Sequence, residues 1–219
     1  MTKKRRILIL CAHPDDEVIG VGGTILNYAK KGIDSYVVIF SGGEKSNALY
    51  KEKKLVSIRE KESQKAGEIL NAKKIINLKL SDMKLYKEAH EKETKDKIRD
   101  IIKKYKPEKI FTHAIDDMLF PDHRAVHDCV LEIVKEFNKK EKKYPVYTFN
   151  IWTLNVRKRN TPKLIVDITN EFPEKVKALK CFKSQSLALL QLTPGIYLKA
   201  LLAGWKNGTK YAEEFYKIE

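Results

Sequence analysis

Short apolar runs alternate along the chain with longer segments of helical periodicity. The apolar runs are rich in β-branched residues and lie at residues 5–12, 34–40, 73–80, 109–114, 146–152 and 163–169. Apolar residues recur at helical spacing over residues 17–31, 55–70, 88–105, 124–137 and 171–184. Strands that alternate with helices form parallel β-α-β units, in which helices cover both faces of the sheet. We therefore predict an α/β protein: one three-layer α/β/α, Rossmann-like domain over residues 1–219, with a mostly parallel sheet.

Residues 187–219 follow this pattern less closely. They contain Pro194 and three glycines, and we interpret them as a C-terminal cover segment, with helical turns that lie over the sheet or beside the substrate. No apolar run approaches the ~20 residues of a membrane-spanning helix, so we expect no transmembrane segment. The first apolar run ends at Ala12, too early for a signal peptide, and the three cysteines are far apart. These features predict a cytoplasmic protein.

The charge of the chain raises the question of a nucleic-acid partner. The formal net charge is +15, and a basic surface attracts phosphates. Only seven of the 44 basic residues are arginines, however, and arginine is the residue that favours base reading and bidentate phosphate contacts. The lysines are spread along the chain among Glu and Asp, which is typical of solvated helix faces. We therefore expect no specific nucleic-acid binding.

Candidate chemistry begins directly after the first predicted strand, in the segment AHPDDEVIGVGGT at residues 12–24. Loops at the carboxyl ends of strands hold the sites of such folds. His13 and Asp16 offer an imidazole and a carboxylate that one turn can place around a cation, and zinc accepts both ligand types. Asp15 is then free to contact a water molecule. The alternative is an acidic helix N-terminus, which explains Asp16 or Glu17 but not His13.

A third ligand is expected from the end of another strand. Residues 111–127 end a predicted strand, begin a helix, and contain three of the five histidines: His113, His123 and His127. Asp122 is a natural N-cap residue, and His123 then lies in the first helical turn.

Several motifs together resemble one family. They are AHPDDE followed by GGT, SIREKESQKAGEIL at residues 57–70, PDHRAVH at 121–127, VDITNEFPEKVKALKCFKSQ at 166–185 and KYAEEF at 210–215. On these motifs the chain resembles the LmbE-like, or PIG-L-like, zinc-dependent N-deacetylases over nearly its whole length.

The resemblance implies a site and an activity. Zn²⁺, or another divalent cation, is expected on His13, Asp16 and His123. Asp15 is expected to be the general base, and Asp122 a second catalytic residue that orients an imidazole. The implied reaction is hydrolysis of the acetamide of an N-acetylglucosamine-type sugar, carried on a glycoside, lipid or nucleotide, to acetate and free amine. The resemblance leaves the oligomeric state open.

Two further residues are candidates for substrate binding. The resemblance places Arg59 near the sugar, and its alternative role is a helix-surface arginine paired with Glu60 or Glu62. Asp82 is a candidate for sugar hydroxyl groups, and its alternative role is an ordinary Asp turn.

The chain departs from the family pattern at Phe120. The family's second motif usually begins with a histidine that stabilises the oxyanion, and loss of one such donor costs ~10²–10³ in rate. The sequence therefore leaves a second hypothesis: a weakly active or non-catalytic homologue that binds metal and sugar. His113, His127 or an arginine are candidates to replace the missing donor.

Overall fold

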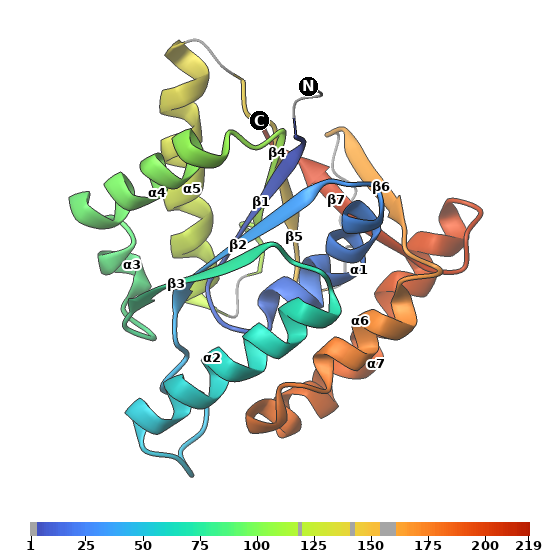
Figure 1. The fold of residues 1–219 in the computed structure, drawn as a ribbon, viewed down its shortest axis with the longest axis horizontal. Coiled ribbons are helices and arrows are strands. Elements are labelled where there is room, and N and C mark those ends of the chain that lie inside the picture. The colour runs from blue at the N-terminus through green and yellow to red at the C-terminus, as the bar shows by residue number, and fades with distance from the viewer. Residues whose placement is uncertain (1–3, 118–119, 141–142, 154–160) are drawn as a thin grey trace.

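The computed structural model describes residues 4–117, 120–140, 143–153 and 161–219. Within them, seven strands form one sheet in the order β3-β2-β1-β4-β5-β7-β6 (Figure 1). The strands are β1 (Arg6–Cys11), β2 (Asp34–Ser41), β3 (Lys74–Leu80), β4 (Lys109–His113), β5 (Val146–Phe149), β6 (Lys163–Asp167) and β7 (Ala212–Lys217). Strands β1 to β5 are parallel, and β7 pairs antiparallel with both β5 and β6.

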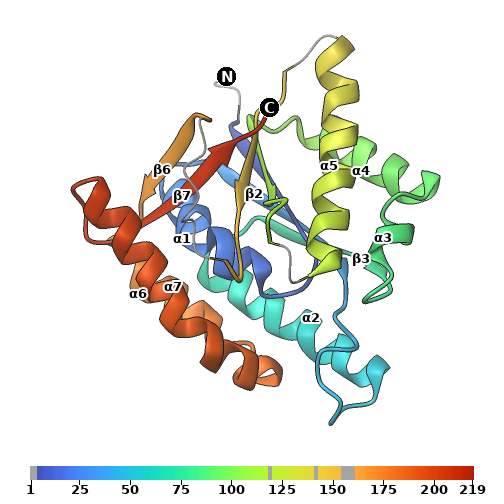
Figure 2. The same cartoon turned by 180° about the vertical axis from the view of Figure 1, so that it is seen from behind.

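Helices cover both faces of this sheet (Figures 1 and 2). One face carries α1 (Asp16–Lys30), α2 (Glu52–Ile69), α6 (Phe172–Leu179) and α7 (Ser186–Lys206), which follows the 3₁₀ turn η1 (Lys183–Gln185). The other face carries α3 (Leu85–Glu88), α4 (Lys92–Tyr105) and α5 (Pro121–Lys140). The prediction of a three-layer α/β fold with a mostly parallel sheet is confirmed.

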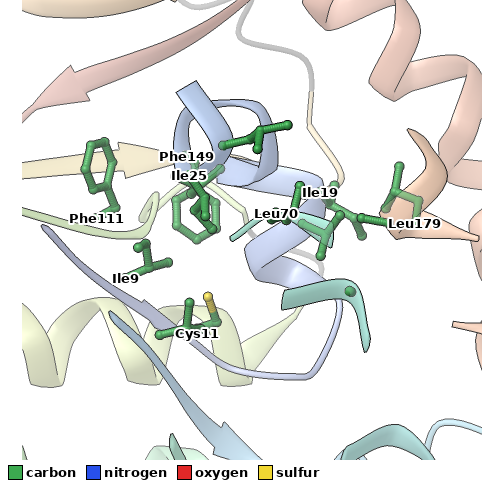
Figure 3. Packing of buried hydrophobic residues seen from close by; sticks show 14 of the residues in the cluster. Ile9, Cys11, Ile19, Ile25, Leu70, Phe111, Phe149 and Leu179 are labelled. Carbon is green, nitrogen blue, oxygen red and sulfur yellow. The ribbon is translucent and has the colours of Figure 1, made fainter. Parts of the chain in front are cut away.

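Central strands form because their side chains are buried on both faces. Ile7 to Cys11 of β1 are all fully buried, and they alternate between two separate clusters, one on each side of the sheet. Figure 3 shows the cluster beneath α1, where Ile9 and Phe111 of the sheet face Ile25 of the helix. Near-continuous apolar runs are what doubly covered parallel strands require.

The glycines of α1 let this helix approach the sheet closely. A methyl group at Gly23 would lie 2.7 Å from Ile168, and one at Gly20 would overlap the ring of Phe149. Separations this short are incompatible with any side chain in place, so the backbone itself makes the contact. These two glycines therefore account for the close packing of α1 on its neighbours.

Three details differ from the sequence prediction. The helix predicted over 88–105 begins only at Lys92, as α4, and is preceded by the separate short helix α3, which the sequence analysis did not predict. The helix predicted over 171–184 ends at Leu179. The interpreted cover segment 187–219 contains the helix α7, but its last part is β7, a strand inside the sheet. The sequence AEEFYK did not predict this strand, because the acidic Glu213 indicates an exposed position. In the structure Glu213 is buried and paired with Lys175 at 2.6 Å.

One helix is apolar for much of its length. The segment Lys183–Lys206 is long and apolar enough to cross a membrane by length and composition alone, although the sequence analysis found no such run. Its inner side contributes Leu189, Ile196 and Ala200 to the protein core.

Candidate active site

The first site loop joins the end of β1 to the start of α1. Its turn is closed by His13 N–H, which donates to Asp16 Oδ2 at 2.9 Å, and by Asp15 N–H, which donates to Glu17 Oε2 at 2.9 Å. Asp15 has φ 110°, a conformation that is costly for a residue with a side chain. Arg59 holds this loop from α2, because its guanidinium donates to the Pro14 carbonyl and to Asp15 Oδ2. The strained turn thus points Asp15 and Asp16 in different directions.

Three candidate ligands come together at this edge of the sheet. The ligand atoms of His13, Asp16 and His123 all lie within 4.8 Å of one another. Asp16 Oδ2 is 3.8 Å from His13 Nδ1 and 3.6 Å from His123 Nε2. Two imidazoles and a carboxylate are a donor set that zinc accepts, with room for a further ligand. The residues present therefore fit a divalent metal ion of this class.

The outer nitrogen of each imidazole faces a carboxylate. His123 Nδ1 is 2.8 Å from Asp117 Oδ2, and His13 Nε2 is 3.0 Å from Asp82 Oδ1 and 3.4 Å from Asp122 Oδ2. Such contacts hold the outer nitrogens protonated, which leaves His13 Nδ1 and His123 Nε2 free to face Asp16. Two further groups of side chains could also hold a cation, and each shares one histidine with the group of His13, Asp16 and His123. They are His113-Asp117-His123 and His13-Asp82-Asp122.

The Asp117 carboxylate, which contacts His123, is itself held in place by backbone hydrogen bonds. It is fully buried, and its two oxygens accept hydrogen bonds from the backbone N–H groups of Ile151 and Trp152 at 3.0 and 3.1 Å. The sequence analysis missed this residue. The signal was available, because Asp117 follows the β4 strand end inside the histidine-rich segment that was singled out.

Burial and neighbouring charges set the protonation of the site. Burial raises the pKa of Asp15 to about 6, with Arg59 opposing the shift. Burial also acts to raise the pKa of Asp16, but the imidazoles of His123 and His113 outweigh it and place this pKa well below its usual value. Asp16 is therefore ionised among the histidines at neutral pH. The Asp15 carboxyl group, in contrast, titrates not far below neutral pH.

A pocket of about 480 Å³ opens over these residues. Its lining combines these polar side chains with the apolar residues Met83, Phe120, Trp152 and Leu192. The Phe120 ring stacks on Trp152 and on His123, with centroids 5.0 and 5.2 Å apart. The position where the family pattern leads one to expect a histidine is therefore occupied by an aromatic ring that lies against the imidazole of His123, a candidate ligand.

A family model for PIG-L, the GlcNAc-PI de-N-acetylases, matches residues 8–134 of the chain. The chain belongs to the PIG-L family.

The relatives of this PIG-L protein include deacetylases and a hydratase. A probable N-acetyl-alpha-D-glucosaminyl L-malate deacetylase 2 of Bacillus cereus is 27% identical, with 87% of this chain and 88% of the relative covered. A 4-oxalmesaconate hydratase of Pseudomonas putida is also 27% identical, with 84% and 75% covered. The structure of N,N'-diacetylchitobiose deacetylase from Pyrococcus horikoshii superposes with a TM-score of 0.82 at 24% identity, covering 98% of this chain and 84% of the other.

All seven site residues expected from the sequence line the same pocket of this PIG-L protein: His13, Asp15, Asp16, Arg59, Asp82, Asp122 and His123. Asp122 is the second residue of α5 rather than its N-cap, and its Oδ2 accepts from Met83 N–H at 2.7 Å. Asp82 is more than an ordinary turn residue, since it is 8% exposed and contacts His13.

Arg59 does not lie on the helix surface. It is 2% exposed, and besides its contacts with the site loop it donates to the Gly43 carbonyl and to Ser46 Oγ. Pairing with Glu60 or Glu62 at the surface is therefore wrong. The guanidinium is committed to protein partners and borders the pocket at the same time.

Two histidines that were candidates to replace the missing donor lie elsewhere. His113 is fully buried, and its Nε2 accepts from Ala12 N–H at 3.0 Å. His127 Nδ1 is 2.7 Å from the His113 carbonyl oxygen. Neither belongs to the pocket lining, so the structure brings neither of them to the position left by the family histidine.

Proposed function

We propose that this protein is a metal-dependent N-deacetylase that removes the acetyl group from an N-acetylglucosamine-type amino sugar. The observation that carries the proposal is the grouping of His13, Asp16 and His123 beside Asp15 in one pocket. The family membership and the deacetylase relatives support the reaction class. The products are acetate and the free amine.

We propose that His13, Asp16 and His123 hold the cation, with zinc expected and another divalent ion as the alternative. Such an ion, when bound, polarises a carbonyl oxygen and makes water more acidic. In the proposed reaction the oxygen of a water molecule adds to the amide carbonyl carbon, and the C–N bond then breaks. Asp15 accepts the proton of that water and returns it to the departing amine nitrogen.

The remaining site residues have supporting roles in this proposal. Arg59 holds the Asp15 carboxylate through the 3.1 Å contact of Nη2 with Oδ2. Asp122 and Asp82 orient the imidazole of His13, which both of them face. Asp82 also borders the pocket, and we assign it to a contact with sugar hydroxyl groups, whereas we assign Arg59 to substrate binding through the Asp15 loop that it holds, because its Nη atoms already donate to protein acceptors. The three free cysteines support a cytoplasmic location.

A second candidate follows from Phe120. This residue replaces the usual donor with an apolar ring, so a metal- and sugar-binding homologue with little turnover is the alternative. Binding does not separate the two candidates, because both bind metal and sugar, whereas turnover does.

The deciding experiment measures free amine released from a panel of N-acetylglucosaminyl sugars and glycosides, using an amine-reactive dye, on protein loaded with zinc. We expect release by the wild type. Asp15→Asn should lose about 10²–10⁴ of the rate while keeping its metal, because Asp15 moves protons and is not a ligand. His13→Ala should lose the metal itself. Amine release that is equal in the wild type and Asp15→Asn would contradict the assignment of the base.

Phe120→His separates the two candidates. If the wild type is a full enzyme with another donor, the new imidazole should change the rate little or obstruct the pocket. If the wild type is nearly inactive, the imidazole should raise the rate by up to ~10²-fold. No amine from either protein, with metal present, would exclude the deacetylase proposal for these sugars, and 4-oxalmesaconate, an unsaturated tricarboxylic acid, would then be tested because of the hydratase relative.

A further inference from the structure

One lysine of the apolar helix α7 is directed into the protein. Between Lys183 and Lys206 the sequence contains a single charged residue, Lys199. Its ammonium group donates hydrogen bonds to the carbonyl oxygens of Ile151 and Asn150 at 2.6 and 3.2 Å. Because burying part of a charged group costs free energy unless the group is hydrogen-bonded, these two contacts hold the lysine in this position.

The two carbonyl groups belong to the same peptide groups that hold Asp117. The Asn150 carbonyl shares its peptide group with the N–H of Ile151, which donates to Asp117 Oδ2 at 3.0 Å. The Ile151 carbonyl shares its peptide group with the N–H of Trp152, which donates to Asp117 Oδ1 at 3.1 Å. Each peptide group therefore accepts a hydrogen bond from Lys199 at its oxygen and donates one to Asp117 at its nitrogen.

This link ends at a candidate metal ligand. Asp117 Oδ2 is 2.8 Å from His123 Nδ1. His123 lies on α5 and Lys199 on α7, and these two helices cover opposite faces of the sheet (Figures 1 and 2). The segment after β5 therefore connects a cation on one face of the sheet to an imidazole of the site on the other face.

The hydrogen bonds and the charge of Lys199 act on Asp117 in the same direction. A donor at the carbonyl oxygen polarises a peptide group and makes its N–H a stronger donor. Stronger N–H donors, with a positive charge behind them, favour a carboxylate that is ionised and fixed in orientation. The interaction is mutual: burial lowers the pKa of Lys199 to about 8, and the charge of Asp117 opposes this shift. The amine is therefore mainly protonated at neutral pH.

We propose that Lys199 is a positioning residue of the site: it fixes the Asp117 carboxylate, which in turn orients the imidazole of His123 toward the metal ion. Lys199 does not line the pocket, so it acts through Asp117 and not by touching the substrate. The inference rests on the proposed function, because it takes His123 as a metal ligand. Its test is metal binding, which does not depend on turnover.

The experiment measures the zinc affinity of the full chain by competition with a coloured chelator. Lys199→Met removes the ammonium group and keeps most of the side-chain length. It should weaken zinc binding by about 3- to 10-fold, less than the loss of a direct partner of a ligand. Lys199→Arg keeps the charge and the donors and should retain most of the affinity. Lys206→Met is the matched control, because Lys206 is exposed at the end of the same helix and should have no effect.

A double-mutant cycle separates positioning through Asp117 from a general loss of stability. In the Asp117→Asn background the carboxylate on which Lys199 acts is absent. Lys199→Met should therefore weaken zinc binding much less in this background than in the wild type, because two residues of one network are not additive. A lysine that only anchors α7 to the end of β5 would instead cause the same loss in both backgrounds.

Several results would overturn the proposal. They are equal zinc affinity of the wild type and Lys199→Met, an equal loss in both backgrounds of the cycle, and a loss in Lys199→Arg as large as that in Lys199→Met. Circular dichroism checks that each variant is folded. Lys199→Gln, which keeps a donor but no charge, replaces Lys199→Met if that variant does not fold, and it should also weaken zinc binding. A wild type that binds no zinc would overturn the inference together with the metal site, whereas failure of the deacetylase reaction is detected separately, by amine release.

Discussion

At the residue scale, the site depends on carboxylates that stand behind the histidines. His13 faces Asp82 and Asp122 with its outer nitrogen, and His123 faces Asp117. An imidazole has two similar nitrogens, and the carboxylate decides which of them carries the proton. Each candidate ligand therefore comes with a partner that selects its tautomer and its ring orientation.

Asp117→Asn tests this dependence. An amide in place of the carboxylate should keep the packing but lose the charge that holds His123 Nδ1 protonated, so zinc affinity should fall by about 10- to 100-fold. Competition with a coloured chelator measures the affinity. Asp128→Asn is the control, because Asp128 is exposed on the same helix α5 and should have no effect. Equal affinities of the wild type and Asp117→Asn would show that Asp117 does not support the ligand.

At the element scale, β7 explains how the last part of the chain completes the sheet. Helix α7 ends at Lys206, and the chain turns back over residues 207–211 into β7, which lies between β5 and β6. Buried Glu213 of β7 accepts from the N–H groups of Gly23 and Thr24 at 2.9 and 2.8 Å. The strand therefore connects α1 to this part of the sheet through a charged residue rather than an apolar one.

Gly204 makes the turn into β7 possible. A methyl group there would lie 2.6 Å from the Lys210 carbonyl oxygen and 2.8 Å from that of Thr209. Because these are backbone atoms, they cannot move aside as a side chain can. Gly204→Ala should lower the free energy of unfolding by about 1–3 kcal/mol relative to a matched helix glycine.

Gly195→Ala supplies the matched control. A methyl group at Gly195 meets no atom within 4 Å, and both variants gain the same helix propensity of up to ~1 kcal/mol. The difference between them therefore isolates the clash at Gly204. Urea unfolding at one protein concentration measures both, and equal stability of the two variants would disprove the close approach.

At the scale of the whole molecule, the net charge of +15 comes mainly from lysines that are spread along the whole chain. Several exposed lysines pair with acidic neighbours, such as Lys97 with Glu93 at 2.7 Å and Lys177 with Glu174 at 3.3 Å. Exposed pairs of this kind contribute little to stability and are screened by salt. The surplus of positive charge remains available to any polyanion at low ionic strength.

Binding to duplex DNA should therefore be weak and independent of base sequence. If six to ten phosphates are neutralised, affinity should fall by about 10³–10⁵ between 50 and 200 mM salt, because binding then rests on counterion release. Fluorescence anisotropy with two unrelated duplexes measures this dependence. Tight binding of one duplex that persists at the higher salt would indicate a specific nucleic-acid partner and weaken the enzyme proposal.

The sequence by itself determined the class of fold and the local chemistry. Continuous apolar runs and period-3.6 patterns depend on neighbouring residues, so the strands β1 to β6 and most of the helices were predictable. The loop with His13, Asp15 and Asp16 and the turn with His123 were recognisable for the same reason, since each is a short contiguous motif. Parallel strands place their carboxyl ends at one edge, which predicted that these two segments meet.

Only the tertiary structure decided which distant side chains face each other. No periodicity encodes the contact of Asp117 with His123. Arg59 is buried because the loops at Pro14 and Gly43 supply its acceptors. Strand β7 was missed because the burial of Glu213 depends on Lys175 and on α1, both remote in sequence. From sequence alone a charged residue is predicted to be exposed, because its partner is not known. Burying a charge is favourable only when it is paired and hydrogen-bonded.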